Sequence, residues 1–212
     1  SLANVMEGME YGYFLMIYPD YSNLFSTKLR RENKKNMRKS VFLVLLTVES
    51  LAVREGENAT VGRLDLNRYM GKWYEIARFD HSFERGLVGV SAEYSFRKDG
   101  KIRVINSGYK DSLGGERKRA EGKAKQPDPA DPGKLKVSFF LFFYGDYYVL
   151  ELDQEYRWAL IGSPTKKYLW ILSRTPHLPQ EVLNGILELA RKHGYNTEKL
   201  IFVEQPETDQ SV

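Results

Sequence analysis

The sequence has no cysteine among its 212 residues. This absence excludes a disulfide framework, a zinc site built on thiolates and a cysteine nucleophile. Histidine is almost as scarce, and His81, His177 and His193 are too scattered for their spacing to place two of them on one metal ion. We therefore predict no metal site, no cofactor and no catalytic residue, which argues against an enzyme.

The excess of positive over negative charge in the sequence is also small. The formal net charge is +4, and half of this excess lies within residues 1–52. The basic stretch Gly115–Lys125 alternates its lysines and arginines with small residues, and it lacks the interleaved aromatic rings on which nucleic acid bases stack. We predict no nucleic acid partner. With 42% hydrophobic residues the chain can bury one sizeable core, so we expect one folded domain.

The N-terminal part of the chain lacks the periodicity of the rest. Residues 1–36 are interpreted as an upstream or artefactual segment, because Met37 provides a new start. Two basic residues follow Met37, then the short apolar run Val41–Val48 and a group of small residues, which is typical of a secretory signal peptide at 37–52. The alternative is a hydrophobic segment packed on the domain, which Glu49 favours because an acidic residue is unusual beside a signal's apolar run.

The remaining chain divides into a linker at 53–63, a domain at 64–205 and a tail at 206–212. Within the domain, short runs rich in β-branched and aromatic residues alternate with turn residues, a pattern typical of antiparallel sheet. Eight runs predict eight strands: Lys72–Phe79, Val90–Phe96, Lys101–Tyr109, Arg117–Lys125, Lys134–Phe142, Tyr147–Leu152, Arg157–Gly162 and Tyr168–Ser173.

One amphipathic helix is predicted after the strands, at Leu178–Gly194, with its apolar residues at helical spacing and Gly194 as C-terminal cap. The run Leu200–Gln205 is a candidate edge strand. Eight strands with short connections favour an all-β fold, an eight-stranded antiparallel up-and-down β-barrel, because closure removes exposed edges. The C-terminal α-helix would pack outside it, since the helix has one apolar face. A barrel of this size can hold one small ligand.

Three short motifs stand at defined places of the predicted barrel. Gly71 and Trp73 open the first strand, Asp153 and Tyr156 lie in the turn between the sixth and seventh strands, and Arg174 follows the eighth. In order and spacing, these motifs resemble those of the lipocalins. The runs around them are similar to the bacterial outer-membrane lipocalins, which are relatives of apolipoprotein D.

The resemblance covers about Leu64–Gln205 and implies a protein that stores or transports a fatty acid or a lysophospholipid in the cell envelope. The alternatives are another small hydrophobic ligand or an isomerase activity, which some lipocalins perform through a cysteine that this chain lacks. The implied location is the periplasm or outer membrane of a Gram-negative bacterium. Such relatives are typically anchored by lipid on a cysteine, so we expect this chain to be released or tethered otherwise. The sequence does not decide between a monomer and a homodimer.

The motif residues are expected to be structural. Connections in an up-and-down barrel alternate between its two ends, which brings all three motifs to the end where the first strand begins. Trp73 would plug the barrel floor, Gly71 would let the chain cross beneath it, and Arg174 could lie over the indole face.

The opposite, open end is where function is expected. The run Phe142, Phe143 and Tyr144 places three aromatic residues in one connection there, with Lys166 and Lys167 on a neighbouring loop. An aromatic and basic rim of this kind suits a peripheral contact with an anionic membrane. The alternative is that the aromatic residues pack under a neighbouring loop.

A lipid cavity needs apolar and aromatic walls with a few polar groups. Strand alternation offers Leu150 and Trp170 as wall residues, and the resemblance implies that Glu93 and Tyr148 occupy cavity positions. A carboxylate at Glu93 would repel a fatty acid head group and could pair with the ammonium group of a lysophospholipid. The alternative for Glu93 is a solvated position on the outer face of the barrel.

Overall fold

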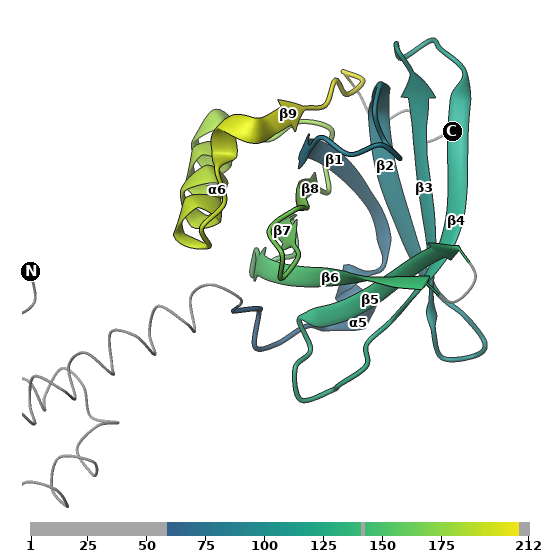
Figure 1. Ribbon diagram of the computed structural model, residues 1–212, viewed down its shortest axis with the longest axis vertical. Coiled ribbons are helices and arrows are strands. Elements are labelled where there is room, and N and C mark those ends of the chain that lie inside the picture. The colour runs from purple at the N-terminus through teal and green to yellow at the C-terminus, as the bar shows by residue number, and fades with distance from the viewer. Residues whose placement is uncertain (1–58, 141–142, 208–212) are drawn as a thin grey trace, which may run out of the picture. The chain divides into compact units, whose positions relative to one another are not determined.

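The computed structural model describes residues 59–140 and 143–207 (Figure 1). In these residues nine strands form one sheet in the order β2-β3-β4-β5-β6-β7-β8-β1-β9, and β1 also pairs with β2. This extra pairing closes β1 to β8 into a barrel. The elements are α5 (Leu66–Tyr69), β1 (Gly71–Phe79), β2 (Leu87–Phe96), β3 (Ile102–Lys110), β4 (Arg117–Lys125), β5 (Lys134–Phe140), β6 (Phe143–Leu152), β7 (Trp158–Gly162), β8 (Leu169–Ser173), α6 (Gln180–Lys192), the 3₁₀ helix η2 (Thr197–Lys199) and β9 (Leu200–Phe202).

The predicted fold class is confirmed, since β1 to β8 form an antiparallel up-and-down barrel with a C-terminal helix. Two strands begin three or more residues earlier than the sequence indicated. β2 starts at Leu87, because it pairs with β3 as far as Lys110. β6 starts at Phe143, which pairs with Phe140 of β5. The expected turn at Gly145 therefore lies within the strand.

Near the N-terminal end of the described chain, the predicted linker contacts the barrel. The Thr60 hydroxyl donates to Asp131 over 2.9 Å, and the Val61 amide donates to the Val149 carbonyl over 3.0 Å. The segments predicted at 1–36 and 37–52 lie outside the described residues. Among the described residues no helix has the length and apolar character needed to cross a membrane.

The helix α6 packs against the outer face of the barrel (Figure 1). Its buried residues Ile186 and Ala190 join Leu150, Leu160 and other outward residues in one hydrophobic cluster. Gly194 follows α6 with a φ of +79°, a conformation that glycine adopts without strain. The short strand β9 then pairs with β1, as the sequence suggested for this run.

A second hydrophobic cluster fills the closed end of the barrel. It includes Tyr69, Trp73, Tyr94 and Leu172. The short helix α5, which sequence periodicity did not reveal, lies beneath this cluster, and the Asp65 side chain caps it by accepting from the Asn67 amide. The barrel wall is therefore apolar on both sides: inside near the floor, and outside under α6.

Candidate ligand-binding site

The barrel floor is built around Trp73, whose side chain is fully buried. Its indole Nε1 donates to the Tyr69 carbonyl over 2.8 Å, and the Cζ of Arg174 lies 3.8 Å from the ring centroid on the indole face. Gly71 has a φ of +91°, and a Cβ there would meet the Arg174 guanidinium at 3.4 Å. The expected plug and its cation–π contact are thus present.

Arg174 ties three floor segments together. Its guanidinium donates to the carbonyls of Lys72, Arg68 and Tyr156 over 2.8, 2.6 and 3.2 Å. Burial lowers the pKa of Arg174, but the group stays charged because arginine titrates far above neutrality. These bonds connect α5, β1 and the turn before β7.

The motif residues Asp153 and Tyr156 shape the turn between β6 and β7. Asp153 accepts from the Arg157 side chain at both carboxylate oxygens, each over 2.8 Å, and the hydrogen bonds from Arg157 hold its pKa below the usual range. Tyr156 has a φ of +59°, and its hydroxyl accepts from the Asp65 amide over 2.8 Å. Both residues therefore act in the fold at the floor.

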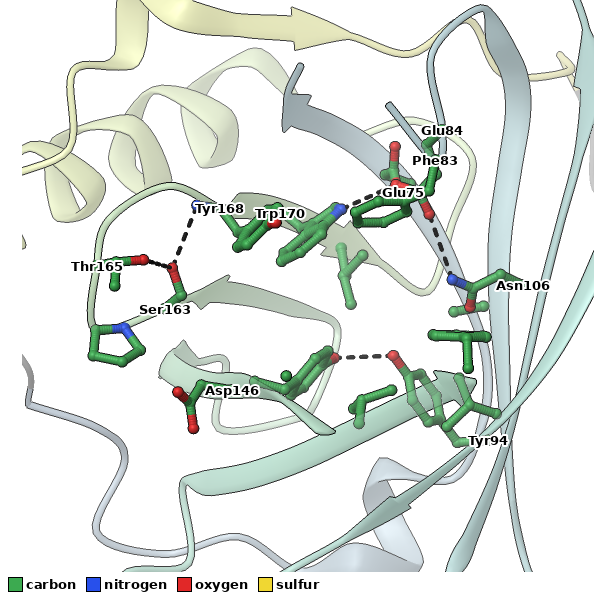
Figure 2. A pocket seen from close by; sticks show the side chains of 18 residues that line it. Glu75, Phe83, Glu84, Tyr94, Asn106, Asp146, Ser163, Thr165, Tyr168 and Trp170 are labelled. Atoms are coloured by element: carbon green, nitrogen blue, oxygen red, sulfur yellow. Dashed lines mark hydrogen bonds between the residues drawn. The ribbon is translucent and has the colours of Figure 1, made fainter. Parts of the chain in front are cut away.

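Above the floor, the barrel encloses a cavity of about 420 Å³ that opens at the other end (Figure 2). The lower walls are apolar and aromatic. The Tyr94 and Tyr147 hydroxyls lie 3.0 Å apart, and burial raises the pKa of both, so each stays protonated. The further lining residues are Glu75, Phe83, Glu84, Ala92, Val104, Asn106, Val137, Phe139, Gly145, Asp146, Ser163, Pro164, Thr165, Tyr168, Trp170 and Leu172.

A buried charged cluster lies on the upper wall of the cavity. Arg78 donates to Glu75 Oε1 over 2.7 Å and to the carbonyls of Glu84 and Leu87 over 2.8 and 3.1 Å. These contacts join β1 to the connection that precedes β2 and to the first residue of β2. A register shift between Glu75 and Ala77 allows Arg78 to reach Glu75, although the two would face opposite sides of a regular strand.

Glu84 is the acceptor at the centre of this cluster. Trp170 Nε1 donates to its carboxylate over 3.2 Å and Asn106 Nδ2 over 3.4 Å, as Figure 2 shows. His81 Nε2 lies 3.0 Å from Glu84 Oε2. The cavity thus carries a polar, acceptor-rich station near its open end.

The two carboxylates of the cluster have opposite pKa shifts. Burial and the neighbouring Glu84 charge raise the pKa of Glu75 well above its usual range, against the effect of Arg78. Burial also acts to raise the pKa of Glu84, but the hydrogen bonds from His81 and Trp170 and the nearby charges hold it below the usual range. Glu75 therefore favours the neutral form and Glu84 the ionised form.

Of the predicted wall residues, Trp170 lines the cavity. The placement of Leu150 and Tyr148 on the cavity wall was wrong. Leu150 and Tyr148 belong to the outer hydrophobic cluster beneath α6, and in β6 it is Tyr147 that points into the cavity. Glu93 was also misplaced: it is exposed and borders a groove on the outer face, while its neighbour Tyr94 points inward. The solvated alternative for Glu93 is the one that the structure supports.

The predicted aromatic contact surface is only partly described. Phe142 lies outside the described residues, and the side chain of Phe143 is not described. Tyr144 is half-buried on the outer face, where the Nζ of Lys125 lies 4.6 Å from its ring centroid.

Sequence reasoning did not assign the polar cavity residues Glu75, Glu84 and Asn106, nor Arg78, which binds Glu75 behind the cavity wall. For the charged residues a signal was present, because they stand within or beside otherwise apolar runs. Glu75 and Arg78 interrupt the apolar run of β1, and two charges in a half-buried strand need partners.

A closed up-and-down barrel with a plugged floor and a mostly apolar cavity is the architecture of a protein that binds small hydrophobic molecules. The family described as the lipocalin-like domain matches residues 64–205. The chain belongs to the lipocalin family.

Known relatives extend this result. Outer membrane lipoprotein Blc of Vibrio cholerae is 47% identical over 171 residues, which cover 79% of this chain and 99% of the relative. Apolipoprotein D of Mus musculus is 31% identical over 184 residues, covering 78% and 95%. Among solved structures, insecticyanin from the tobacco hornworm Manduca sexta matches with a TM-score of 0.56 and 26% identity, covering 70% of this chain and 84% of that one.

Proposed function

We propose that this protein binds one fatty acid or lysophospholipid in its barrel and stores or transports it in the bacterial cell envelope. The observation that carries the proposal is the division of the cavity into apolar aromatic walls below and a polar station at Glu84 above. A hydrocarbon chain would fill the lower part, because burying it removes apolar surface from water. The head group would lie beside the polar station.

The charge at that station bears on the head group. An ionised Glu84 repels a carboxylate, so a fatty acid would bind best in its protonated form. A lysophospholipid with an ammonium group could place that cation beside Glu84. Among the two candidates, the station therefore favours the lysophospholipid.

The envelope location is supported by the name of the Vibrio cholerae relative, an outer membrane lipoprotein. Because that name is of a lipoprotein, the relative gives no support to the expectation that this chain is released or tethered otherwise. A reversible membrane contact through Tyr144 and its neighbours, and a homodimer, stay predictions.

Displacement of a fluorescent fatty acid analogue tests the proposal. We expect saturable binding with one ligand per barrel, and displacement by both a fatty acid and a lysophospholipid. Glu84→Gln should weaken the lysophospholipid relative to the fatty acid, while Glu93→Gln, a matched change on the outer face, should leave both unchanged. Absence of saturable binding for both lipid classes would rule the proposal out.

A further inference from the structure

A second cavity of about 420 Å³ adjoins the first along β2, β3 and β4, and its lining residues Phe83, Ala120 and Phe139 are exposed to solvent. Besides Glu84 and Asn106, its lining combines the polar residues Ser107, Lys118 and Arg119 with the apolar residues Phe83, Leu87, Val90, Gly108, Ala120 and Phe139. Phe83, Glu84, Asn106 and Phe139 line both cavities, so the two adjoin at these residues, and we call them the first and the second lobe.

β4 carries three small residues in alternate positions, of which Ala120 lines the second lobe. In the β3–β4 register, Ala120 faces Asn106, Gly122 faces Val104 and Ala124 faces Ile102. A Cβ at Gly122 would lie 2.8 Å from the Phe139 ring, so this glycine makes room for Phe139. A larger residue at Ala120 would fill the lobe from the side of β4.

The junction between the lobes is polar and rich in acceptors. Glu84 sits there, and the buried Asn106 Oδ1 has no hydrogen-bond partner among the described residues. A ligand group at this point would therefore donate hydrogen bonds, and hydrocarbon would extend from it to either side.

We propose that the barrel accepts a lipid with two hydrocarbon arms that meet at a donating group, such as an amide N–H or a hydroxyl, with one arm in each lobe. The proposal rests on the proposed function in one respect, namely that the first lobe holds a hydrocarbon chain. The four lining residues that the two lobes share and the acceptor pair at their junction favour this occupant over a single bent chain.

The test compares two uncharged ligands on the full chain by displacement of the fluorescent fatty acid analogue. N-octanoylsphingosine has two arms that meet at an amide and a hydroxyl, and monopalmitoylglycerol has one arm. Ala120→Phe fills the second lobe and should weaken N-octanoylsphingosine by about tenfold or more, with monopalmitoylglycerol changed by less than about twofold. Val137→Phe, the matched change in the first lobe, should weaken both, and thermal unfolding verifies that each variant is folded.

Each other outcome has a definite meaning. Equal weakening of both ligands by Ala120→Phe means that a single bent chain occupies both lobes, and no weakening of either means that the second lobe is not used. Both results overturn the proposal. If the unmodified protein binds monopalmitoylglycerol but not N-octanoylsphingosine, the two-armed ligand is wrong while the proposed lipid-binding function stands. If the unmodified protein binds neither ligand, both the two-armed ligand and the proposed lipid-binding function lose their support.

Discussion

The floor and the open end of the barrel differ in how their buried polar groups are satisfied. At the floor, the indole of Trp73, the hydroxyl of Tyr69 and all three nitrogens of the Arg174 guanidinium make hydrogen bonds. Near the open end, buried atoms such as Asn106 Oδ1 and His81 Nδ1 have no hydrogen-bond partner among the described residues.

This difference separates structure from function. A network with every member satisfied stabilises one arrangement, whereas an unpaired buried polar atom has a free-energy cost that a ligand can remove. The motif residues that identify the family therefore maintain the barrel, and the residues that would select a ligand lie in the less regular upper wall. Substitutions at the two ends should affect different measurements.

The largest expected effect is on stability at the floor. Trp73→Ala should lower the free energy of unfolding by about 3–5 kcal/mol, because it leaves a large cavity in a packed cluster. Trp170→Ala near the open end should cost less stability and should weaken lipid binding, since Trp170 is only half-buried and lines the cavity. Urea unfolding and ligand displacement measure the two effects. A Trp73→Ala variant with unchanged stability and lost binding would reverse the comparison.

A smaller effect is expected at the buried carboxylates. Glu84→Gln should cost about 1.5–3 kcal/mol at neutral pH, because it removes hydrogen bonds to a charged acceptor. The lowered pKa of Glu84 means that its contribution is present above the ordinary glutamate pKa and is lost as the pH falls through the folded-state value. The raised pKa of Glu75 acts in the opposite sense: its contribution is lost as the pH rises through the folded-state value.

Unfolding measured from about pH 2 to about pH 9 separates the two groups, because the Glu84 contribution is lost below the ordinary glutamate pKa. Glu84→Gln should flatten the loss of stability on the acid side, and Glu75→Gln should flatten the loss on the alkaline side. Glu93→Gln is the control, because this carboxylate is exposed on the outer face. An identical pH profile for all three variants would mean that neither buried carboxylate has the assigned shift.

The arrangement of the barrel floor could be predicted from the sequence, because its residues stabilise the fold and their positions follow from the order of the strands. The strand count and the alternation of connections between the two barrel ends are enough to predict that Trp73, Gly71 and Arg174 lie close together. The closed barrel itself followed from regularly spaced apolar runs and turns, while α5 was missed because four residues are too short to show helical periodicity.

The cavity wall could not be predicted in the same way. In β6 both faces are apolar, since α6 covers the outer face, so hydrophobicity does not distinguish inward Tyr147 from outward Tyr148. In β1 the register shift after Glu75 changes the alternation and brings Arg78 to its carboxylate. Such shifts depend on pairing with neighbouring strands, which a single strand's sequence does not reveal.

The smallest expected effect on stability comes from Phe83, which is 59% exposed and stacks on His81 with ring centroids 3.8 Å apart. Phe83→Ser should change the free energy of unfolding by only about 0.5 kcal/mol, as for most surface substitutions. It should nevertheless speed ligand dissociation, because Phe83 lines both lobes at the open end and covers apolar ligand surface there. Phe96, 52% exposed near the floor end of β2, is the matched control, and Phe96→Ser should leave dissociation unchanged. Stopped-flow dissociation of the fluorescent analogue decides the matter: equal rates for the two variants would mean that Phe83 takes no part in retaining the ligand.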